Sequence, residues 1–199
     1  MNRHAVVDDL PRRLRAERER RGISLRELAR RLDVSASAIS QIETGRTRPT
    51  VATLWAIVTE LGMSLDDLFE HTPGSAPAVV TEETREAIRL ASGVRWERLT
   101  AAEEPDADFI LVTYEVGGSS SRDDELVAHH GREYGLVLSG KLEVTVGFES
   151  SVLGRGASIS FDSTTPHRLR NVGEEPVTAV WFVNRAGRSG ARRGSPSRD

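Results

Sequence analysis

The chain has 199 residues, a net charge of -3 and a hydrophobic fraction of 38%, which exclude a wholly disordered chain and a uniformly basic nucleic-acid-binding protein. It contains no cysteine, which excludes disulfides, thiolate metal sites and a cysteine nucleophile, and leaves histidines and carboxylates as the strong metal ligands. No apolar run is long enough to span a bilayer and no secretory signal is evident, so we expect a cytoplasmic protein without a membrane partner.

Charge is distributed unevenly along the chain. Residues 1–50 carry a net charge of +5, whereas residues 72–184 carry -8. The stretch 71–78 contains two prolines and a glycine without hydrophobic periodicity, which is typical of a linker. We therefore predict four segments in chain order: a helical domain over 1–71, a linker over 72–92, a β domain over 93–184 and a disordered basic tail over 185–199.

Apolar residues from Leu10 to Phe69 recur at helical spacing, which predicts five short helices. The clearest signal is Ser24 with Glu27, a pair spaced as a capping box and followed by apolar residues on one helical face. Further N-cap candidates begin the next three helices: Ser35, Thr50 and Ser64.

The third predicted helix follows the second across a short turn, Leu32 to Ser35, as in a helix-turn-helix. Its outward residues are small or polar, and the amide of Gln41 can make two hydrogen bonds to an adenine edge. The loop from Thr44 to Arg48 adds cations suited to phosphate oxygens. The alternatives are a helical bundle that docks a protein and, for six N-terminal arginines, a solvated surface: Arg12, Arg13, Arg15, Arg18, Arg20 and Arg21.

Residues Leu10 to Phe69 resemble the helix-turn-helix of the XRE and phage-repressor family. The resemblance is carried by the run from Ile23 to Ala29, by Val34-Ser35, by the run from Ile39 to Glu43, and by Gly45 and Pro49-Thr50. It implies a lambda-repressor-like domain that binds a double-stranded DNA operator as a homodimer. By matching position, it implies base-facing residues Ser35, Ala36, Ser37, Ser40 and Gln41, and phosphate-side residues Ser24, Thr44, Arg46 and Arg48.

Beyond the linker, short β-rich runs alternate with turn residues, which predicts a closed barrel or a sandwich. Ser139-Gly140 lies between two of these runs and is expected to form a tight hairpin turn. Aromatic residues in the runs are candidates for a small-molecule pocket or for plain core: Trp96, Tyr114, Tyr134, Phe161 and Trp181.

His129, Glu133 and His167 are residues of metal-ligand chemistry placed around the predicted strands. Two imidazoles and one carboxylate with open positions suit non-haem Fe(II), and nickel, zinc or manganese fit the same ligands. The alternative is a hydrogen-bonded polar cluster without metal at the bottom of a ligand pocket. His130 is expected to point outward.

This region resembles the cupin family, a small jelly-roll β-barrel. The resemblance rests on the run from His129 to Gly135, on Gly156, and on Pro166-His167 with Asn171 after them. Metal-binding members usually have an additional histidine where this chain has Val127, and an aspartate is common where it has Ala157. In such a barrel we expect the aromatic residues Trp96, Tyr114 and Phe161 to line the pocket, and the resemblance makes His129, Glu133 and His167 the candidate metal ligands.

The two resemblances together predict an α + β multidomain protein, with a five-helix helix-turn-helix domain and a cupin barrel. We expect a transcriptional regulator rather than an enzyme, with no catalytic residues and a small-molecule effector bound in the cupin. The alternative is a non-haem Fe(II) oxygenase similar to hydroxypropylphosphonic acid epoxidase, in which the helical head is only a scaffold.

Overall fold

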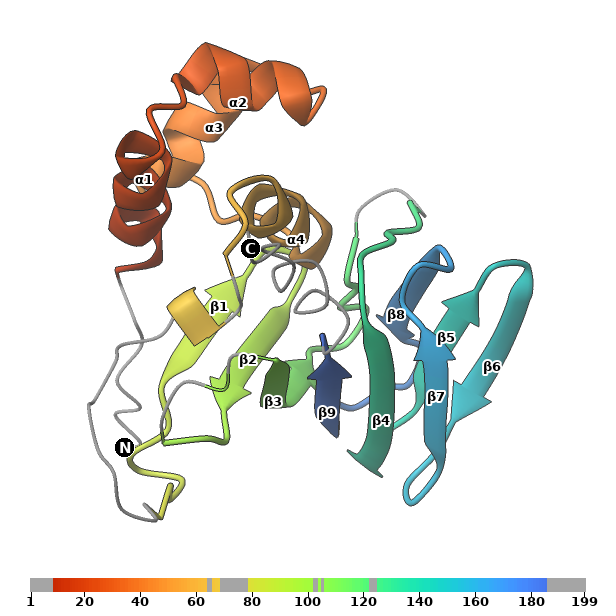
Figure 1. Cartoon of the computed structure of the whole chain (residues 1–199). Helices are drawn as coiled ribbons and strands as arrows, with labels where there is room; N and C mark the ends of the chain where they lie inside the picture. The colour runs from red at the N-terminus through yellow and green to blue at the C-terminus, as the bar shows by residue number, and fades with distance from the viewer. Residues whose placement is uncertain are drawn as a thin grey trace, which may run out of the picture.

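The structure, a computed structural model, describes residues 9–63, 66–68, 79–101, 104, 106–121 and 125–185. Helices form the N-terminal part, and strands form the C-terminal part (Figure 1). No helix within these residues is long and apolar enough to cross a membrane.

The N-terminal part, called here the helical region, contains four α-helices: α1 Leu10–Arg20, α2 Leu25–Arg31, α3 Ala36–Glu43 and α4 Val51–Glu60. Three of the predicted N-caps are confirmed, because each side-chain oxygen accepts a backbone N–H three residues later: Ser24 from Glu27 at 3.1 Å, Ser35 from Ala38 at 3.1 Å, and Thr50 from Thr53 at 3.0 Å. These bonds satisfy backbone donors that a helix leaves unpaired at its start.

The prediction of a fifth helix was wrong. The described residues there form only a three-residue 3-10 turn, η1 Asp66–Leu68, and the predicted cap Ser64 lies outside the described residues. Two consecutive aspartates are poor helix formers, and one turn is sufficient to bury Leu68.

The turn between α2 and α3 is tight because Asp33 adopts a left-handed backbone conformation, with φ of 52°. Aspartate tolerates this conformation better than most residues. The N–H of Val34 then donates to the carbonyl of Ala29 at 3.0 Å, and α3 packs across α2 with Leu28 and Ile39 buried between them.

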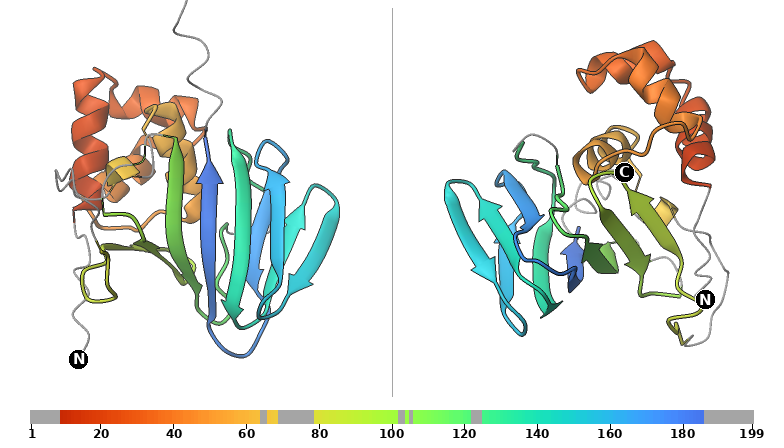
Figure 2. Two further views of the ribbon diagram at one scale, coloured as in Figure 1. Left: turned by 60° about the horizontal axis from the view of Figure 1, so that its bottom comes forward. Right: turned by 180° about the vertical axis from the view of Figure 1, so that it is seen from behind.

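The C-terminal part, called here the barrel, contains nine described strands: β1 Ala87–Leu90, β2 Val94–Arg98, β3 Ala107–Tyr114, β4 Arg132–Ser139, β5 Leu142–Val146, β6 Glu149–Leu153, β7 Ser158–Asp162, β8 His167–Asn171 and β9 Val177–Asn184. They form a six-stranded sheet in the order β1-β2-β3-β9-β4-β7 and a three-stranded sheet in the order β6-β5-β8. All of these pairings are antiparallel, and the two sheets lie side by side (Figure 2). The predicted α + β architecture is therefore confirmed, with four α-helices in place of five.

Two strands differ from the sequence expectation. β1 lies inside residues 72–92, which we predict as linker, yet Ile88 is buried opposite Trp96 of β2, so the barrel begins before residue 93. β6 had no alternating apolar pattern to reveal it, because it is an edge strand whose side chains are largely exposed.

The hairpin predicted at Ser139-Gly140 was wrong. These residues join β4 to β5, which belong to different sheets, and Gly140 makes the crossing with φ of 79°. The tight hairpin instead joins β5 to β6 at Gly147, which also has positive φ.

The first residue of the predicted tail, Arg185, is ordered against the barrel. Arg185 is held by the barrel, because its N–H donates to the carbonyl of Asp106 at 2.6 Å and its guanidinium pairs with Asp108 at 3.2 Å. Residues 186–199 lie outside the described part of the chain.

Candidate nucleic-acid interface and ligand pocket

Helix α3 buries one side and presents the other to solvent. Ile39 and Ile42 are buried in the helical region, whereas Ser35, Ser37 and Gln41 are exposed. The remaining residues expected to face bases, Ala36 and Ser40, are half-buried on the rim of this face. Helices α1 to α3 lie beyond α4, away from the sheets (Figure 1). The outer side of α3 is thus bare, as a helix that enters a major groove must be.

The amide of Gln41 is held lightly at this surface. Its Nε2 donates to Ser37 Oγ at 3.4 Å, and its Oε1 accepts from Thr47 Oγ1 at 3.2 Å. Both bonds are long and exposed, so they can be exchanged for a base edge that offers one donor and one acceptor. Sequence reasoning missed Thr47, whose position in the cationic loop was its only signal.

The loop after α3 places two cations beside the recognition helix. Gly45 turns the chain with φ of 72°, and the N–H of Arg46 donates to the carbonyl of Gln41 at 2.9 Å. Arg46 and Arg48 are exposed, and neither pairs with an acidic side chain in the described part of the chain. Thr44 and Ser24 are exposed as well. These groups are available to phosphate oxygens.

Arg18 does not belong to a solvated surface, so that part of the expectation was wrong. Its Nε and Nη2 donate to the two carboxylate oxygens of Glu43 at 2.7 and 2.8 Å, and the two residues are only 6% and 7% exposed. A third donor, Nη1, reaches the carbonyl of Ile23 at 2.8 Å. This bidentate pair fastens the C-terminal end of α3 to α1 and sets the angle of the recognition helix.

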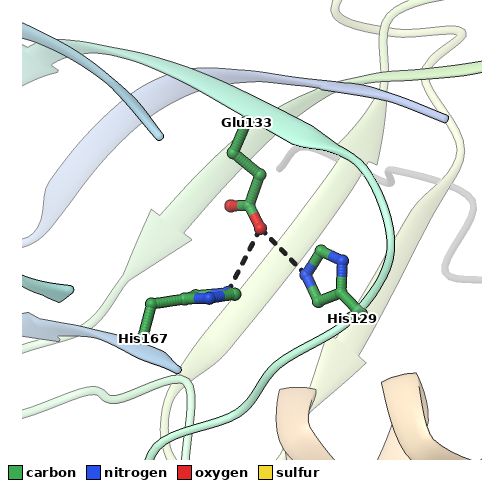
Figure 3. Close-up of side chains that lie close together, drawn as sticks. All are labelled: His129, Glu133 and His167. Carbon is green, nitrogen blue, oxygen red and sulfur yellow. Dashed lines mark ion pairs between the residues drawn. The ribbon is translucent and has the colours of Figure 1, made fainter. Parts of the chain in front are cut away.

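The structure brings His129, Glu133 and His167 together, as the sequence predicts (Figure 3). Glu133 lies on β4, His167 begins β8, and the loop before β4 carries His129. Oε1 of Glu133 lies 2.8 Å from His129 Nε2 and 3.2 Å from His167 Nε2. The three residues are 7%, 4% and 3% exposed in chain order, so the cluster is almost closed to water.

The ligand atoms of this cluster fit a divalent metal. His167 Nδ1 lies 2.9 Å from the carbonyl of Thr165, and His129 Nδ1 lies 3.3 Å from the carbonyl of His130. A proton on each Nδ1 leaves the Nε2 lone pairs facing Glu133. Outside the cluster itself, His129 Nε2 and Glu133 Oε1 have no hydrogen-bond partner within the described residues. Adjacent ligands on an octahedral metal with bonds of about 2.1 Å lie about 3 Å apart, close to the two separations between Glu133 and the histidines.

The three side chains of the cluster shift one another's protonation equilibria even without a metal. Burial acts to raise the pKa of Glu133, but the two imidazoles lower that pKa well below its usual range overall. Burial likewise acts to lower the pKa of His167, but the Glu133 carboxylate raises it above 6.5 overall. Glu133 is therefore ionised at neutral pH, and a metal would compete with a proton for His167.

The cluster borders a cavity with mainly apolar walls, formed by Val51, Trp55, Trp96, Ile110, Val112, Tyr114, Ser120, Val127, Glu133, His167, Leu169, Trp181 and Val183. Trp96 and Tyr114 line it as expected, and so does Trp181. Phe161, the third residue expected there, does not line the cavity; its ring packs on His167 with centroids 4.9 Å apart. Tyr134 faces outward, as alternation along β4 requires, because its neighbour Glu133 faces inward. His130 is exposed, as expected.

Gly135 makes room for the side chain that holds Glu133 in place. Trp181 Nε1 donates to Glu133 Oε2 at 2.6 Å, and a Cβ on Gly135 would lie 2.1 Å from the Trp181 ring. Only glycine allows β4 and β9 to pair here with that indole in position. The site therefore depends on a residue without a functional group.

Sequence reasoning missed Val51 and Trp55, which reach the barrel cavity from α4 of the helical region. A signal was present: Val51 extends the apolar face of Leu54 and Val58 toward the start of the helix, and Trp55, four residues after Val51, widens that face on one side. An apolar face that is wider than one helix contact needs indicates a second packing partner.

Comparison with known proteins assigns both parts. Residues 14–68 match the helix-turn-helix family, and residues 110–183 match the cupin domain family. The HTH-type transcriptional regulator SutR of Escherichia coli K12 is 30% identical over 166 residues, covering 82% of this chain and 88% of SutR. The HTH-type transcriptional regulator PuuR of the same strain is 28% identical over 163 residues, covering 80% of this chain and 86% of PuuR.

A crystal structure of an HTH_3 family transcriptional regulator from Vibrio cholerae shares the fold. Its TM-score is 0.65 at 23% identity, and the match covers 89% of this chain and 95% of that one. The helix-turn-helix match includes the exposed helix α3, and the cupin match includes most of the barrel that encloses the cavity. The chain therefore belongs to the HTH-type transcriptional regulators, with a DNA-binding helix-turn-helix joined to a cupin ligand-binding domain.

Proposed function

We propose that α3 reads an operator in the major groove, with Gln41 as its main base contact and with Ser35, Ala36, Ser37 and Ser40 allowing close approach. Ser24, Thr44, Arg46 and Arg48 hold the adjoining phosphates. The observation that carries this proposal is the polar, solvent-facing side of α3 above a buried Ile39 and Ile42. Specific binding to DNA from the chain's own promoter tests it, and the variants are argued in the Discussion.

A small molecule bound in the barrel then acts through linkage. A ligand that prefers one arrangement of the molecule over another changes DNA affinity by the same factor by which DNA changes ligand affinity. In a dimer, the arrangement that matters is the spacing of the two recognition helices, because half-sites lie about 34–36 Å apart.

The outer face of the large sheet supports a homodimer. Phe109, Tyr134, Leu136 and Leu138 are 38–42% exposed on β3 and β4, and Phe182 of β9 joins them between the two strands (Figure 2). A continuous apolar surface of this kind commonly marks an interface, and a twofold axis through it would carry two recognition helices. We propose that a second copy of the chain covers this face.

Replacing Leu136 with arginine is expected to shift the protein from dimer to monomer, because the change places a charge in the centre of the apolar face. Sedimentation velocity at micromolar concentration measures the shift. Val152 on edge strand β6, exposed at 59% and away from the face, offers a matched control as Val152→Arg, which should stay dimeric. A monomeric parent protein, or equal behaviour of the two variants, would refute the assignment.

We also propose that His129, Glu133 and His167 hold a divalent ion of the iron, nickel, zinc or manganese type. Such an ion would act as a Lewis acid or as an anchor for a ligand. The support is the matched separation of their donor atoms and the orientation of both Nε2 atoms toward Glu133.

His129→Ala and Glu133→Gln are each expected to weaken metal binding by more than the roughly 10- to 100-fold loss that is typical of a residue that only orients a ligand. Titration of chelator-treated, untagged protein with Zn²⁺ and Mn²⁺, followed by calorimetry, measures the loss. His130→Ala is the matched control, because His130 is the exposed neighbour of His129, and it should bind as the parent does. Equal loss in the control, or no uptake by the parent protein, contradicts the assignment.

The second candidate function is a non-haem Fe(II) oxygenase, since two histidines and a glutamate also suit that chemistry. Failure of the parent protein to hold stoichiometric metal after loading with Fe(II) would end this alternative. Operator binding that is lost with Gln41 or Arg46 would favour the regulator.

A further inference from the structure

Helix α4 belongs to two cores at once. Leu54, Ile57 and Val58 are buried outside the cavity lining, and α4 contacts α2 of the helical region, whereas Val51 and Trp55 line the barrel cavity with Glu133 and His167. The Trp55 ring stacks on the His129 imidazole, with centroids 3.9 Å apart and planes 12° apart. A DNA-binding element therefore supplies part of the wall of the ligand pocket.

The backbone contacts between α4 and the barrel are few. The N–H of Ala52 donates to the carbonyl of Ser120 at 3.0 Å, and just before α4 the carbonyl of Pro49 accepts from Ala91 at 2.9 Å. Trp55 also meets the edge of the Trp96 ring at 6.5 Å. Stacking on His129 is thus a side-chain contact that adds to these two backbone bonds and to the buried Val51 in docking α4 on the barrel.

The cavity is too small for an effector as it stands. The cavity volume is about 30 Å³, which is enough for about two water molecules. Pockets for small organic ligands measure about 300–1,000 Å³. A ligand of several heavy atoms must therefore displace a wall.

Only one of the aromatic walls is free to move without breaking the sheet. Trp96 and Trp181 are buried on paired strands, and Trp181 is also bonded to Glu133. Trp55 is half-buried on a helix, and its indole stacks on the imidazole of His129. Displacing Trp55 requires loss of a stack and a shift of α4, with no broken strand pairing.

We propose that Trp55 occupies the effector's place in this structure. A small molecule with a flat apolar part takes the position of the indole against His129, lines up beside Glu133, and releases α4 from the barrel. Because α4 also contacts α2, and α2 packs against α3, α3 moves with it. This inference rests on the proposed operator and effector functions, and it specifies how they are connected.

The test is a double-mutant cycle read in two ways, with chelator present to exclude metal effects. Trp55→Ala, His129→Ala and the double variant are compared with the parent protein and with His130→Ala as the matched control. Amide hydrogen exchange at Ala52 measures docking, and titration of labelled promoter DNA measures operator affinity. Exchange at Ile57, inside α4, reports whether the helical region remains folded.

Each single variant is expected to speed exchange at Ala52 and to change operator affinity in the same direction by at least about fivefold, the lower end of common coupling factors. The double variant should change it no further than either single variant, because both remove one contact. His130→Ala should match the parent. If Trp55→Ala speeds exchange at Ile57, the helical region of that variant is no longer properly folded. The result for His129→Ala, which leaves the sequence of α4 unchanged, is then the one that tests the proposal.

Free indole is the probe for the pocket itself. It should bind Trp55→Ala, slow exchange at Ala52 again and return operator affinity toward the parent value, because it refills the space against His129. The double variant, which lacks that imidazole, should not respond. An indole response that is equal in the two variants would overturn the proposal.

Failure of this inference is distinguishable from failure of the proposed function. If the parent binds its promoter but both single variants remain within about twofold of it, a change below the usual range of coupling, the connection through Trp55 is wrong and the regulator stands. If the parent does not bind the promoter, operator recognition itself fails. In that case, if indole also fails to bind Trp55→Ala, the assignment of the Trp55 position as the ligand site is wrong as well.

Discussion

Glu43→Ala is expected to destabilise the helical region by about 3–5 kcal/mol, because it leaves the Arg18 guanidinium buried without its counter-charge. The pair is bidentate, with both N–O distances below 3 Å, and both residues are nearly inaccessible. Since Glu43 ends α3 and Arg18 lies on α1, operator binding should be lost together with helical structure. Urea unfolding followed by far-UV circular dichroism measures the free energy.

Two further variants separate the buried pair from ordinary surface charge. Glu19→Ala removes a half-exposed carboxylate from the same helix, which pairs with Arg15 at 2.9 Å and reaches Arg18 Nη2 only at 3.6 Å, so it should destabilise the protein far less than Glu43→Ala does. Arg18→Met combined with Glu43→Leu removes both charges and should recover much of the lost stability. If Glu43→Ala unfolds like Glu19→Ala, the buried pair does not fasten α3 to α1.

Gln41→Ala is expected to weaken binding to the operator by about 1–3 kcal/mol, while leaving binding to unrelated DNA nearly unchanged, because the amide reads a base edge. Arg46→Ala should instead weaken both kinds of DNA alike and lower the slope of log affinity against log salt by about one, because the guanidinium contacts a phosphate. Fluorescence anisotropy with promoter and scrambled duplexes, over a series of salt concentrations, measures both effects.

The matched control for charge is Arg89→Ala. Arg89 is exposed on β1 of the barrel, far along the chain from α3, so its loss should leave both duplexes and the salt slope unchanged. If Arg89→Ala lowers the slope as Arg46→Ala does, general charge rather than the loop beside α3 binds the DNA. If Gln41→Ala leaves the preference for the operator intact, α3 does not read bases through this residue.

Local features of the helical region could be predicted because they depend on neighbours in the chain. An N-cap such as Ser24 or Ser35 acts on a backbone donor three residues away, and the outer face of α3 follows from helical periodicity. The fifth helix was wrong because Asp66 and Asp67 are poor helix formers and one turn already buries Leu68. Edge strand β6 escaped prediction because an exposed strand needs no alternating pattern.

The cluster of His129, Glu133 and His167 could be predicted because its residue types are chemically distinctive and the cupin resemblance supplied their spacing. Phe161 and Tyr134 were harder, because an aromatic residue in a strand suits core, pocket and surface equally. Their places depend on which side of the sheet is covered, and β4 shows this plainly, with Glu133 inward and Tyr134 outward.

By itself, the sequence determined the helix starts and the polar side of α3, because each follows from spacing over a few residues. It also determined the β-rich body and the three candidate metal ligands, through turn pattern, residue chemistry and the cupin resemblance. Only the tertiary structure decided that Arg18 is buried against Glu43 and that Trp55 closes the barrel pocket over His129. An arginine or a tryptophan suits several environments, and its partner lies 25 residues away in the first case and more than seventy in the second. Contacts across such separations are chosen by the packing of whole elements, so no local pattern in the chain encodes them.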